Sequence, residues 1–366
     1  MYNSLYIHVP FCEGRKCAYC AFYSVTAHDE PMRGSYLRRL EEEFAQYAPQ
    51  CAPLRSIFVG GGTPGLLSAA ELQTLGEAVR RHFALLPDCE WTIEANPESL
   101  SCDKLQTLSR CGVNRLSLGV QSFNGRLRQA IGRRGTLDNL PRLADFAHRC
   151  GMRLNFDLIY AIPGQLPEDW RRDLETALSL QPDHLSCYSL MIEEGTALWR
   201  RHLRTADDGS FLQLWELCDE VLARHGLPRY EISNFSRTGC RCRHNCEIWH
   251  GQSYLGCGPA AASFDGTDRR INPPSLSSWL RRHPPEIDRI APDRRRREIF
   301  AFAFRTVDGW SWRQLRDVCG ITELQLRHDG AVATLSSQGL LTLDHDGIRP
   351  TARGLLYNDD LLEQLI

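Results

Sequence analysis

The chain has 366 residues, 42% of them hydrophobic and 24% charged, which excludes a disordered or fibrous protein. Its 43 lysine and arginine residues nearly balance 45 aspartate and glutamate residues, so no global field attracts nucleic acid or an anionic membrane. No apolar run is long enough to span a bilayer, and no secretory signal is visible at the N-terminus. We therefore expect a cytoplasmic protein without an integral membrane segment.

Short β-rich runs alternate with amphipathic helical stretches over residues 1–192, which is typical of an α/β fold. One helical stretch opens with a capping box formed by Ser68 and Glu71. The alternation predicts a βα barrel, complete or partial. We expect its strands at 5–9, 56–59, 91–95, 115–120, 154–159 and 185–190, and its helices at 36–47, 68–83, 105–111, 137–150 and 168–180.

Most of the expected strands are followed by Gly, Pro, Cys or polar residues instead of a plain connector. In a parallel barrel all of these loops lie on one face, the C-terminal mouth, where active sites are built. The sequence thus predicts that its chemistry lies at this mouth. The segments concerned are 12–20, 60–64, 96–98, 121–123 and 160–164.

The strand-helix alternation stops at Glu193, and the rest of the chain divides into three regions. Residues 193–271 contain an expected helix at 209–225 and a Cys- and Gly-rich segment, which together form an α+β accessory region. The Pro-rich stretch 272–292 predicts a linker. Residues 293–366 predict a small helical, winged-helix-like domain, for which the near-neutral charge gives no reason to expect DNA binding.

The chain has 15 cysteines, an odd number that indicates metal chemistry rather than a disulfide framework in a reducing compartment. Cys12, Cys17 and Cys20 form a C-x4-C-x2-C run in the loop after the first expected strand. Three thiolates can hold a [4Fe–4S] cluster with one iron open to a substrate. A zinc site completed by His8 or a distant cysteine, or three unliganded thiols, remain alternatives at this point.

Further segments carry a resemblance to a known family. The run Tyr6-Ile-His-Val-Pro-Phe-Cys12, with Cys17-x-Tyr-Cys20 and Phe58-Val-Gly-Gly-Gly-Thr-Pro64, resembles the radical S-adenosylmethionine superfamily. Within it the chain is similar to the oxygen-independent coproporphyrinogen III oxidase-like branch. The resemblance implies a partial (β/α)6 barrel. Other matching segments are 93–97, 118–123, 157–160, 163–164, 184–188, 230–235 and 244–245.

The resemblance also implies a set of cofactor residues. The three cysteines would hold a [4Fe–4S] cluster whose open iron binds the amino and carboxylate groups of S-adenosylmethionine and whose electron cleaves the sulfonium to a deoxyadenosyl radical. A side-chain-poor loop would approach the methionine moiety. Carboxylate and amide side chains would bind ribose hydroxyls and the amino group, and Arg133 would pair with the carboxylate. The implied residues are Tyr6, Tyr19, Gly60, Gly61, Gly62, Thr63, Glu94, Gln121, Arg133 and Asp157.

Two features favour the HemW-like branch, described as haem chaperones, over the dehydrogenases. Phe22 stands where the dehydrogenases have a fourth cysteine, and the chain starts directly at the first strand. The branch has an HNxxYW signature, which here reads His244-Asn245-Cys-Glu-Ile-Trp249. A neutral His244 can ligate haem iron, with Trp249 covering the macrocycle. The alternative for His244 is a hydrogen-bonded structural role.

The chain departs from the family pattern at four places. One extra residue separates Cys12 from Cys17, Ile248 replaces the Tyr of HNxxYW, and Ala262 and Gly135 replace histidines. These changes affect the expected haem site more than the cluster site.

We expect a haem chaperone whose cargo is haem and whose partners are recipient haem proteins, including peripheral contact with membrane haem proteins. A radical enzyme acting on a tetrapyrrole or another substrate is the alternative, and a purely haem-binding module is a third. Substrate-dependent formation of deoxyadenosine separates the enzyme from the other two. The sequence does not decide whether the protein turns S-adenosylmethionine over.

Overall fold

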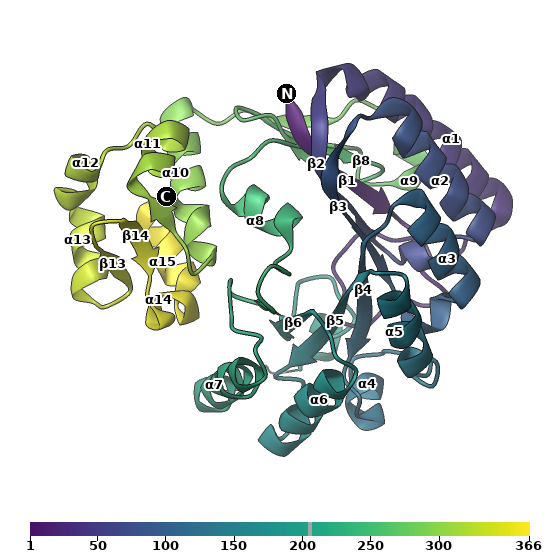
Figure 1. Cartoon of the computed structure of the whole chain (residues 1–366), viewed down its shortest axis with the longest axis horizontal. Helices are drawn as coiled ribbons and strands as arrows, with labels where there is room; N and C mark the ends of the chain where they lie inside the picture. Colours follow the sequence, from purple (N-terminus) through teal and green to yellow (C-terminus); the bar gives the residue numbers. More distant parts are fainter. Residues whose placement is uncertain (204–206) are drawn as a thin grey trace.

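The computed structural model describes residues 1–203 and 207–366 of the chain, and its centre is a curved eleven-stranded sheet (Figure 1). The strand order is β11-β10-β9-β8-β1-β2-β3-β4-β5-β6-β7. Six consecutive strands in this order are parallel, which confirms the predicted partial barrel. They are β1 (Tyr2–Val9), β2 (Cys51–Gly61), β3 (Leu85–Ala95), β4 (Arg115–Gln121), β5 (Arg153–Tyr160) and β6 (His184–Ser189).

The connecting helices cover the outer, convex side of this sheet (Figure 1). The expected helices are present, and the capping box of Ser68 and Glu71 opens the second of them. A six-residue helix, α4, was not predicted because it is too short to show a helical period. In the described part of the chain, no helix has both the length and the hydropathy that crossing a bilayer requires. The helices are α1 (Glu30–Tyr47), α2 (Ala69–His82), α3 (Cys102–Cys111), α4 (Gly125–Ala130), α5 (Leu140–Arg149) and α6 (Pro167–Ser179).

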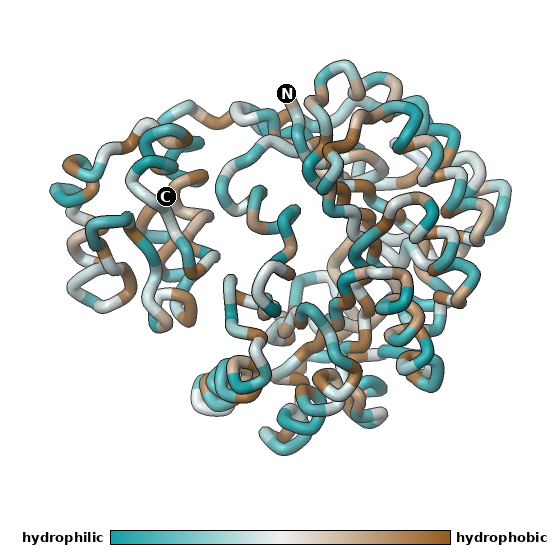
Figure 2. Tube along the Cα trace, in the orientation of Figure 1, coloured by the Kyte–Doolittle hydropathy of each residue, from teal (hydrophilic) through white to brown (hydrophobic). Residues whose placement is uncertain are grey.

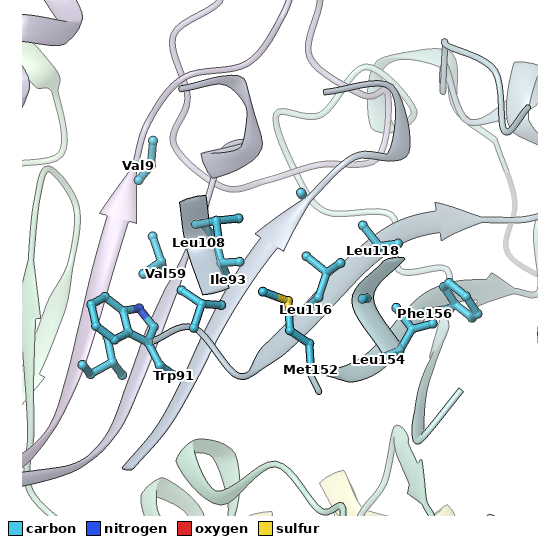
Figure 3. Packing of buried hydrophobic residues seen from close by; sticks show 14 of the residues in the cluster. Val9, Val59, Trp91, Ile93, Leu108, Leu116, Leu118, Met152, Leu154 and Phe156 are labelled. Atoms are coloured by element: carbon cyan, nitrogen blue, oxygen red, sulfur yellow. The ribbon is translucent and has the colours of Figure 1, made fainter. Parts of the chain in front are cut away.

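The main hydrophobic core lies between the sheet and these helices. Successive strand residues point to opposite faces, so one face of each strand supplies apolar side chains to this core. Leu5, Ile7 and Val9 of β1 are fully buried. Figure 3 shows equivalent residues of β2 to β5 packed beside Leu108 of α3, and Figure 2 shows the helical turns alternating between hydrophobic and hydrophilic residues. Each fully buried side chain of this kind contributes about 1.5–3 kcal/mol.

Residues 207–271 extend the sheet at both edges. After α7 (Asp208–Arg224), β7 (Asn234–Ser236) pairs antiparallel with β6. A short helix, α8 (Arg243–Trp249), then lies inside the curve of the sheet (Figure 1). β8 (Tyr254–Cys257) pairs parallel with β1, and β9 (Ala262–Phe264) and β10 (Arg269–Ile271) continue the sheet as antiparallel strands.

The segment 272–292, expected to be a linker, is instead an ordered part of the barrel. It contains α9 (Leu276–Leu280) and the edge strand β11 (Glu286–Asp288). Trp279 is 1% exposed, and its indole N–H donates to a Glu43 carboxylate oxygen at 3.1 Å. The Asn272 amide donates to the other oxygen at 2.7 Å. The proline content of the segment suggested a linker, because the composition of a short segment cannot predict its contacts with a distant helix such as α1.

The C-terminal residues form a second unit with its own small sheet and core. Strands β12 (Trp310–Ser311), β14 (Gly347–Pro350) and β13 (Leu341–Leu343) pair antiparallel in that order. Phe304, Trp310, Leu335 and Ile348 are buried at its centre. Its helices are α10 (Pro292–Phe302), α11 (Trp312–Cys319), α12 (Glu323–Arg327), α13 (Gly330–Ser337), α14 (Ala352–Leu356) and α15 (Asn358–Leu365).

Short 3-10 turns occur along the whole described chain. They are Ala48–Gln50, Pro64–Leu66, Pro97–Ser99, Trp199–Arg201 and Ala303–Arg305, the last of which follows α10 directly.

Candidate cluster and cofactor site

The cysteine run forms a loop that is fixed at both ends. The Cys12 N–H donates to the carbonyl of Val25 at 3.0 Å, and the Ala18 N–H donates to the carbonyl of Ile131 at the end of α4 at 3.0 Å. Cys12, Cys17 and Cys20 are all unpaired and half-buried. Burial raises the pKa of the Cys20 thiol. The loop therefore presents three thiols at the end of β1, between the neighbouring strands and α4.

The extra residue between Cys12 and Cys17 is taken up by a tight turn. Gly14 has a φ of +64°, and the Arg15 N–H donates to the carbonyl of Glu13 at 2.7 Å. A Cβ at Gly14 would meet nothing within 4 Å. The additional residue thus bulges toward open space and leaves the two anchored ends of the loop in place.

The arrangement of the thiols argues against a single zinc ion. Zinc binds thiolates at about 2.3 Å, so tetrahedral ligand sulfurs lie about 3.8 Å apart. In the described chain no three cysteine sulfurs come within 4.8 Å of one another. His8 is also engaged, because its Nε2 is 2.9 Å from the carbonyl of Tyr23 and its Nδ1 is 3.1 Å from the Tyr6 hydroxyl. A four-iron cluster binds its three thiolates through three different irons, so it does not require the three sulfurs to meet at one metal ion.

Beside the thiols, three consecutive glycines form a cradle that admits no side chain. A Cβ at Gly60 would lie 2.7 Å from a carboxylate oxygen of Glu94, and one at Gly62 would lie 2.6 Å from the carbonyl of Phe11. Gly61 has a φ of +106°, and a Cβ there would lie 2.7 Å from the His8 ring. Only glycine fits these positions, so the backbone can approach a ligand closely.

Polar side chains link the cradle to the thiols. The Thr63 hydroxyl donates to the Cys12 sulfur at 3.8 Å, and the Arg133 guanidinium donates to the Cys17 sulfur at 3.7 Å. The same guanidinium donates to the Asn96 side-chain oxygen at 2.6 Å. Arg133 is 8% exposed, and its Nε has no hydrogen-bond partner. An unpaired buried donor costs free energy, so this N–H is available for a bound carboxylate.

Two half-buried carboxyl groups, Glu94 on β3 and Asp157 on β5, lie on either side of β4. Burial, reinforced by the nearby Asp157, raises the pKa of Glu94 to about 8. Burial also raises the pKa of Asp157, although Ser117 and Asn155 each donate to its carboxylate at 2.8 Å. Glu94 is therefore largely protonated at neutral pH and can donate as well as accept a hydrogen bond.

Gln121 and the two tyrosines complete the set of cofactor residues expected from the sequence. Gln121 has a φ of +69°, and its amide lies near Arg133, because a Cβ at Gly119 would meet both side chains within 3.3 Å. The Tyr6 ring stacks on Phe58 with centroids 6.3 Å apart. Tyr19 packs against the small hydrophobic cluster beneath the cysteine loop.

Comparisons with known proteins show which family the chain belongs to. The family model of the radical SAM superfamily matches residues 6–177, and the HemN C-terminal domain matches residues 290–357. Proteins named heme chaperone HemW are 34% identical in Mycobacterium tuberculosis, over 99% of this chain and 94% of the relative, and 34% identical in Escherichia coli, over 98% and 97%. The chain belongs to the HemW family of radical SAM proteins. The solved coproporphyrinogen III oxidase HemN of E. coli has the same fold, with a TM-score of 0.86 at 24% identity over 99% of this chain and 89% of that one.

Several inner-face residues of this HemW-family chain lie in segments that match the family, but their spacing predicts no site role for them. Asn96 joins Thr63 to Arg133, since its amide also donates to the Thr63 hydroxyl at 3.3 Å. On β5 and β6, Asn155 bonds His184 at 2.7 Å, and His184 bonds the Tyr230 hydroxyl at 2.7 Å. Polar residues at every second position of these apolar strands could have predicted them, because successive side chains of a strand point alternately to the barrel interior and to the outer core.

The HemW signature helix α8 places His244 against the inner face of β2. His244 is 3% exposed, its Nδ1 is 2.9 Å from the Ser56 hydroxyl, and its ring stacks on Phe58 at 5.3 Å. Burial lowers the pKa of this imidazole to about 3, so it is neutral at physiological pH. Asn245 is half-buried beside it. In this conformation His244 has the hydrogen-bonded environment of a structural residue.

Trp249 faces away from His244, toward the C-terminal unit. The Arg305 guanidinium lies 4.4 Å from its ring centre, and its indole N–H has no hydrogen-bond partner. Ile248 and Trp249 line a cavity of about 210 Å³ between α8 and α10. The structure therefore does not bring His244 and Trp249 onto one side of a common ligand.

One family departure, at Gly135, has a local explanation in the backbone. Gly135 has a φ of +85°, and a Cβ there would lie 2.6 Å from the Glu98 carboxyl carbon, so a histidine does not fit. Nothing in the structure explains Ala262, which pairs with Ile271 across β9 and β10.

Proposed function

We propose that this protein is a haem chaperone, which binds haem and delivers it to recipient haem proteins in the cytoplasm, including membrane haem proteins that it contacts peripherally. The observation that carries the proposal is the similarity to proteins named heme chaperone HemW, which extends over nearly the whole chain. It includes both the cysteine loop and the helix with the HemW signature. The fold alone would not distinguish a chaperone from an enzyme.

The proposal includes a cluster and cofactor site at the mouth of the barrel. Cys12, Cys17 and Cys20 would hold a [4Fe–4S] cluster, which in its reduced state would supply the one electron that cleaves the sulfonium bond of bound S-adenosylmethionine. The Gly60–Thr63 backbone accepts the methionine moiety, and the free N–H of Arg133 pairs with its carboxylate. The remaining polar contacts, from Glu94, Gln121 and Asp157, serve the ribose and amino groups, while Tyr6 and Tyr19 flank the cluster and the adenine.

For haem, the signature residues His244, Asn245 and Trp249 are the proposed contacts. Because His244 is buried against Ser56 and Phe58, ligation there requires α8 to move away from β2. The motion would break the hydrogen bond and the aromatic stack of the His244 ring, and also the hydrogen bond from the His244 N–H to Glu90 and the ion pair between Glu247 and Arg55 of β2, interactions of about 1 kcal/mol each. Haem ligation of about this free energy or more can offset it.

A combined titration tests the proposal. The protein is reconstituted anaerobically with iron and sulfide, then titrated with haem and S-adenosylmethionine while absorbance and deoxyadenosine are followed. We expect saturable haem binding with little deoxyadenosine. Deoxyadenosine that appears only on addition of a reduced porphyrinogen, without haem binding, would overturn the chaperone proposal in favour of a radical enzyme.

The cluster ligands are tested in the same preparation. We expect Cys17→Ala to abolish the iron–sulfur absorbance, because two thiolates do not hold the cube. Cys102→Ala, at a half-buried cysteine on α3, is the matched control and should retain it. Four irons per chain in the Cys17 variant would contradict the assignment.

A further inference from the structure

The segment that follows β6 is fastened to the cysteine loop. The Leu198 N–H donates to the carbonyl of Ala18 at 2.8 Å, and the Leu190 N–H donates to the carbonyl of Tyr160 at 2.9 Å. Leu190 and Leu198 are buried in a small hydrophobic cluster that also contains Ala18 and Ile131. The two segments therefore form one continuous surface at the mouth of the barrel.

Three large apolar side chains project outward from these fastened segments. Met191 is 62% exposed and Trp199 is 43% exposed, although each follows a leucine that is at most 5% exposed. On the cysteine loop, Phe22 is 68% exposed. Each of the three lies within four residues of Ala18, Leu190 or Leu198, which share one hydrophobic cluster, and exposed large apolar side chains on adjoining segments are typical of a binding surface.

Basic side chains lie directly beside these apolar ones. Lys16, Arg200 and Arg201 are exposed, and within the residues described none of the three has an ion-pair partner at 4 Å or less. Consecutive Cα atoms are about 3.8 Å apart, so Lys16 lies within about 8 Å of Ala18, and Arg200 lies within about 8 Å of Leu198. With Arg15, the two segments carry four basic side chains against three acidic ones, Glu13, Glu193 and Glu194, so their net charge is positive.

We propose that Phe22, Met191, Trp199, Lys16, Arg200 and Arg201 form the surface on which haem docks, here called the mouth patch. The apolar members contact the macrocycle, and the basic members pair with its two propionate carboxylates. The thioether of Met191 can ligate haem iron. This inference rests on the proposed function and adds an accessible docking surface, whereas His244 is buried in the same structure.

Haem titration of the full reconstituted chain tests the mouth patch. We expect Met191→Ala with Trp199→Ala to weaken haem binding about tenfold or more, because two apolar contacts and a ligand are lost. Arg200→Gln with Arg201→Gln should weaken haem binding but leave binding of the propionate dimethyl ester of haem unchanged. Leu324→Ala, at a residue 68% exposed on α12, is the control and should bind haem as the wild type does.

The outcomes distinguish failure of the mouth patch from failure of the chaperone proposal. Haem affinity unchanged in both double variants, with affinity lost in His244→Ala, overturns the mouth patch and leaves the chaperone proposal standing. Absence of saturable haem binding by the wild type overturns the chaperone proposal itself, and the mouth patch with it. Circular dichroism and thermal unfolding of each variant identify any loss that comes from misfolding.

Discussion

At the scale of single residues, a few buried or half-buried polar groups determine the charge and the hydrogen-bonding capacity of the site. Glu94 is the clearest case, because its carboxyl faces both the Gly60–Gly61 backbone and the Asp157 carboxyl. The neutral form of Glu94 is favoured until a ligand brings donors or charge to it. Arg133, in contrast, is a buried cation whose Nε has no hydrogen-bond partner, so it favours an anionic ligand.

The raised pKa of Glu94 predicts a pH-dependent cost to stability. With a pKa of about 8 when folded, against 4.5 as its ordinary value, the carboxyl binds more protons in the folded chain than in the unfolded chain between these values. Stability therefore falls as the pH rises from about 5 to about 8. We expect Glu94→Gln to raise the free energy of unfolding by ~1–2 kcal/mol at pH 8, allowing for partial solvent screening, and to change little at pH 4. Urea unfolding at both pH values measures this, and an equal effect at the two would contradict it.

Sequence motifs identified the residues that touch the expected ligands better than those that support them. The cysteines and the glycine loop occur in recognisable strings, whereas Arg133 was expected only from the family resemblance, and the structure places all of them together. Asn96 and His184 lie in strings that match the family, but their hydrogen bonds could not be inferred from those strings, because their partners come from other parts of the chain. His244 was found through its signature, but its burial against Ser56 depends on how α8 packs and cannot be inferred from the string.

At the scale of elements, the strand ends and the loops after them determine where chemistry can occur. The β2 end is the tightest of these, since Gly60, Gly61 and Gly62 each approach another group too closely for a Cβ. The long parallel strands were predictable because they are apolar runs bounded by turn residues. β7 and β9 to β11 were not, because three residues are too few to show a period.

A pair of glycine substitutions tests the cradle. Gly61→Ala forces a Cβ to within 2.7 Å of the His8 ring at a φ of +106°, so we expect a loss of about 2–4 kcal/mol in unfolding free energy. Gly125→Ala, in α4 where a Cβ meets nothing within 4 Å, should be neutral or slightly stabilising. Similar unfolding midpoints for the two variants would show that the cradle is not tightly packed.

At the scale of the whole molecule, the barrel and the C-terminal unit are joined by ordered structure. Residues 272–292 close the barrel edge through Trp279 and Asn272, which both bond Glu43 of α1. The sequence suggested a linker because proline content is a local signal, whereas these bonds join residues more than 200 positions apart. The cavity at Trp249 lies where the two units meet.

Removing the Trp279 side chain tests this closure. We expect Trp279→Ala to lower the free energy of unfolding by about 3–5 kcal/mol, because it empties a fully buried site and removes a donor to buried Glu43. Trp199→Ala, at an exposed tryptophan, is the matched control and should change stability by no more than about 0.5 kcal/mol. Equal stability of both variants in urea unfolding would show that residues 272–292 do not stabilise the barrel and act only as a linker.

We propose that the protein carries haem and gives it up to another protein. The most direct measurement is transfer from the haem-loaded, cluster-reconstituted chain to an apo-haem protein, followed by the Soret band of the acceptor after the two proteins are separated. We predict that the acceptor gains haem while the chain loses it in equal amount, with no porphyrin chemically altered. Haem that stays on the chain, or reaches the acceptor no faster than free haem does, would contradict the account.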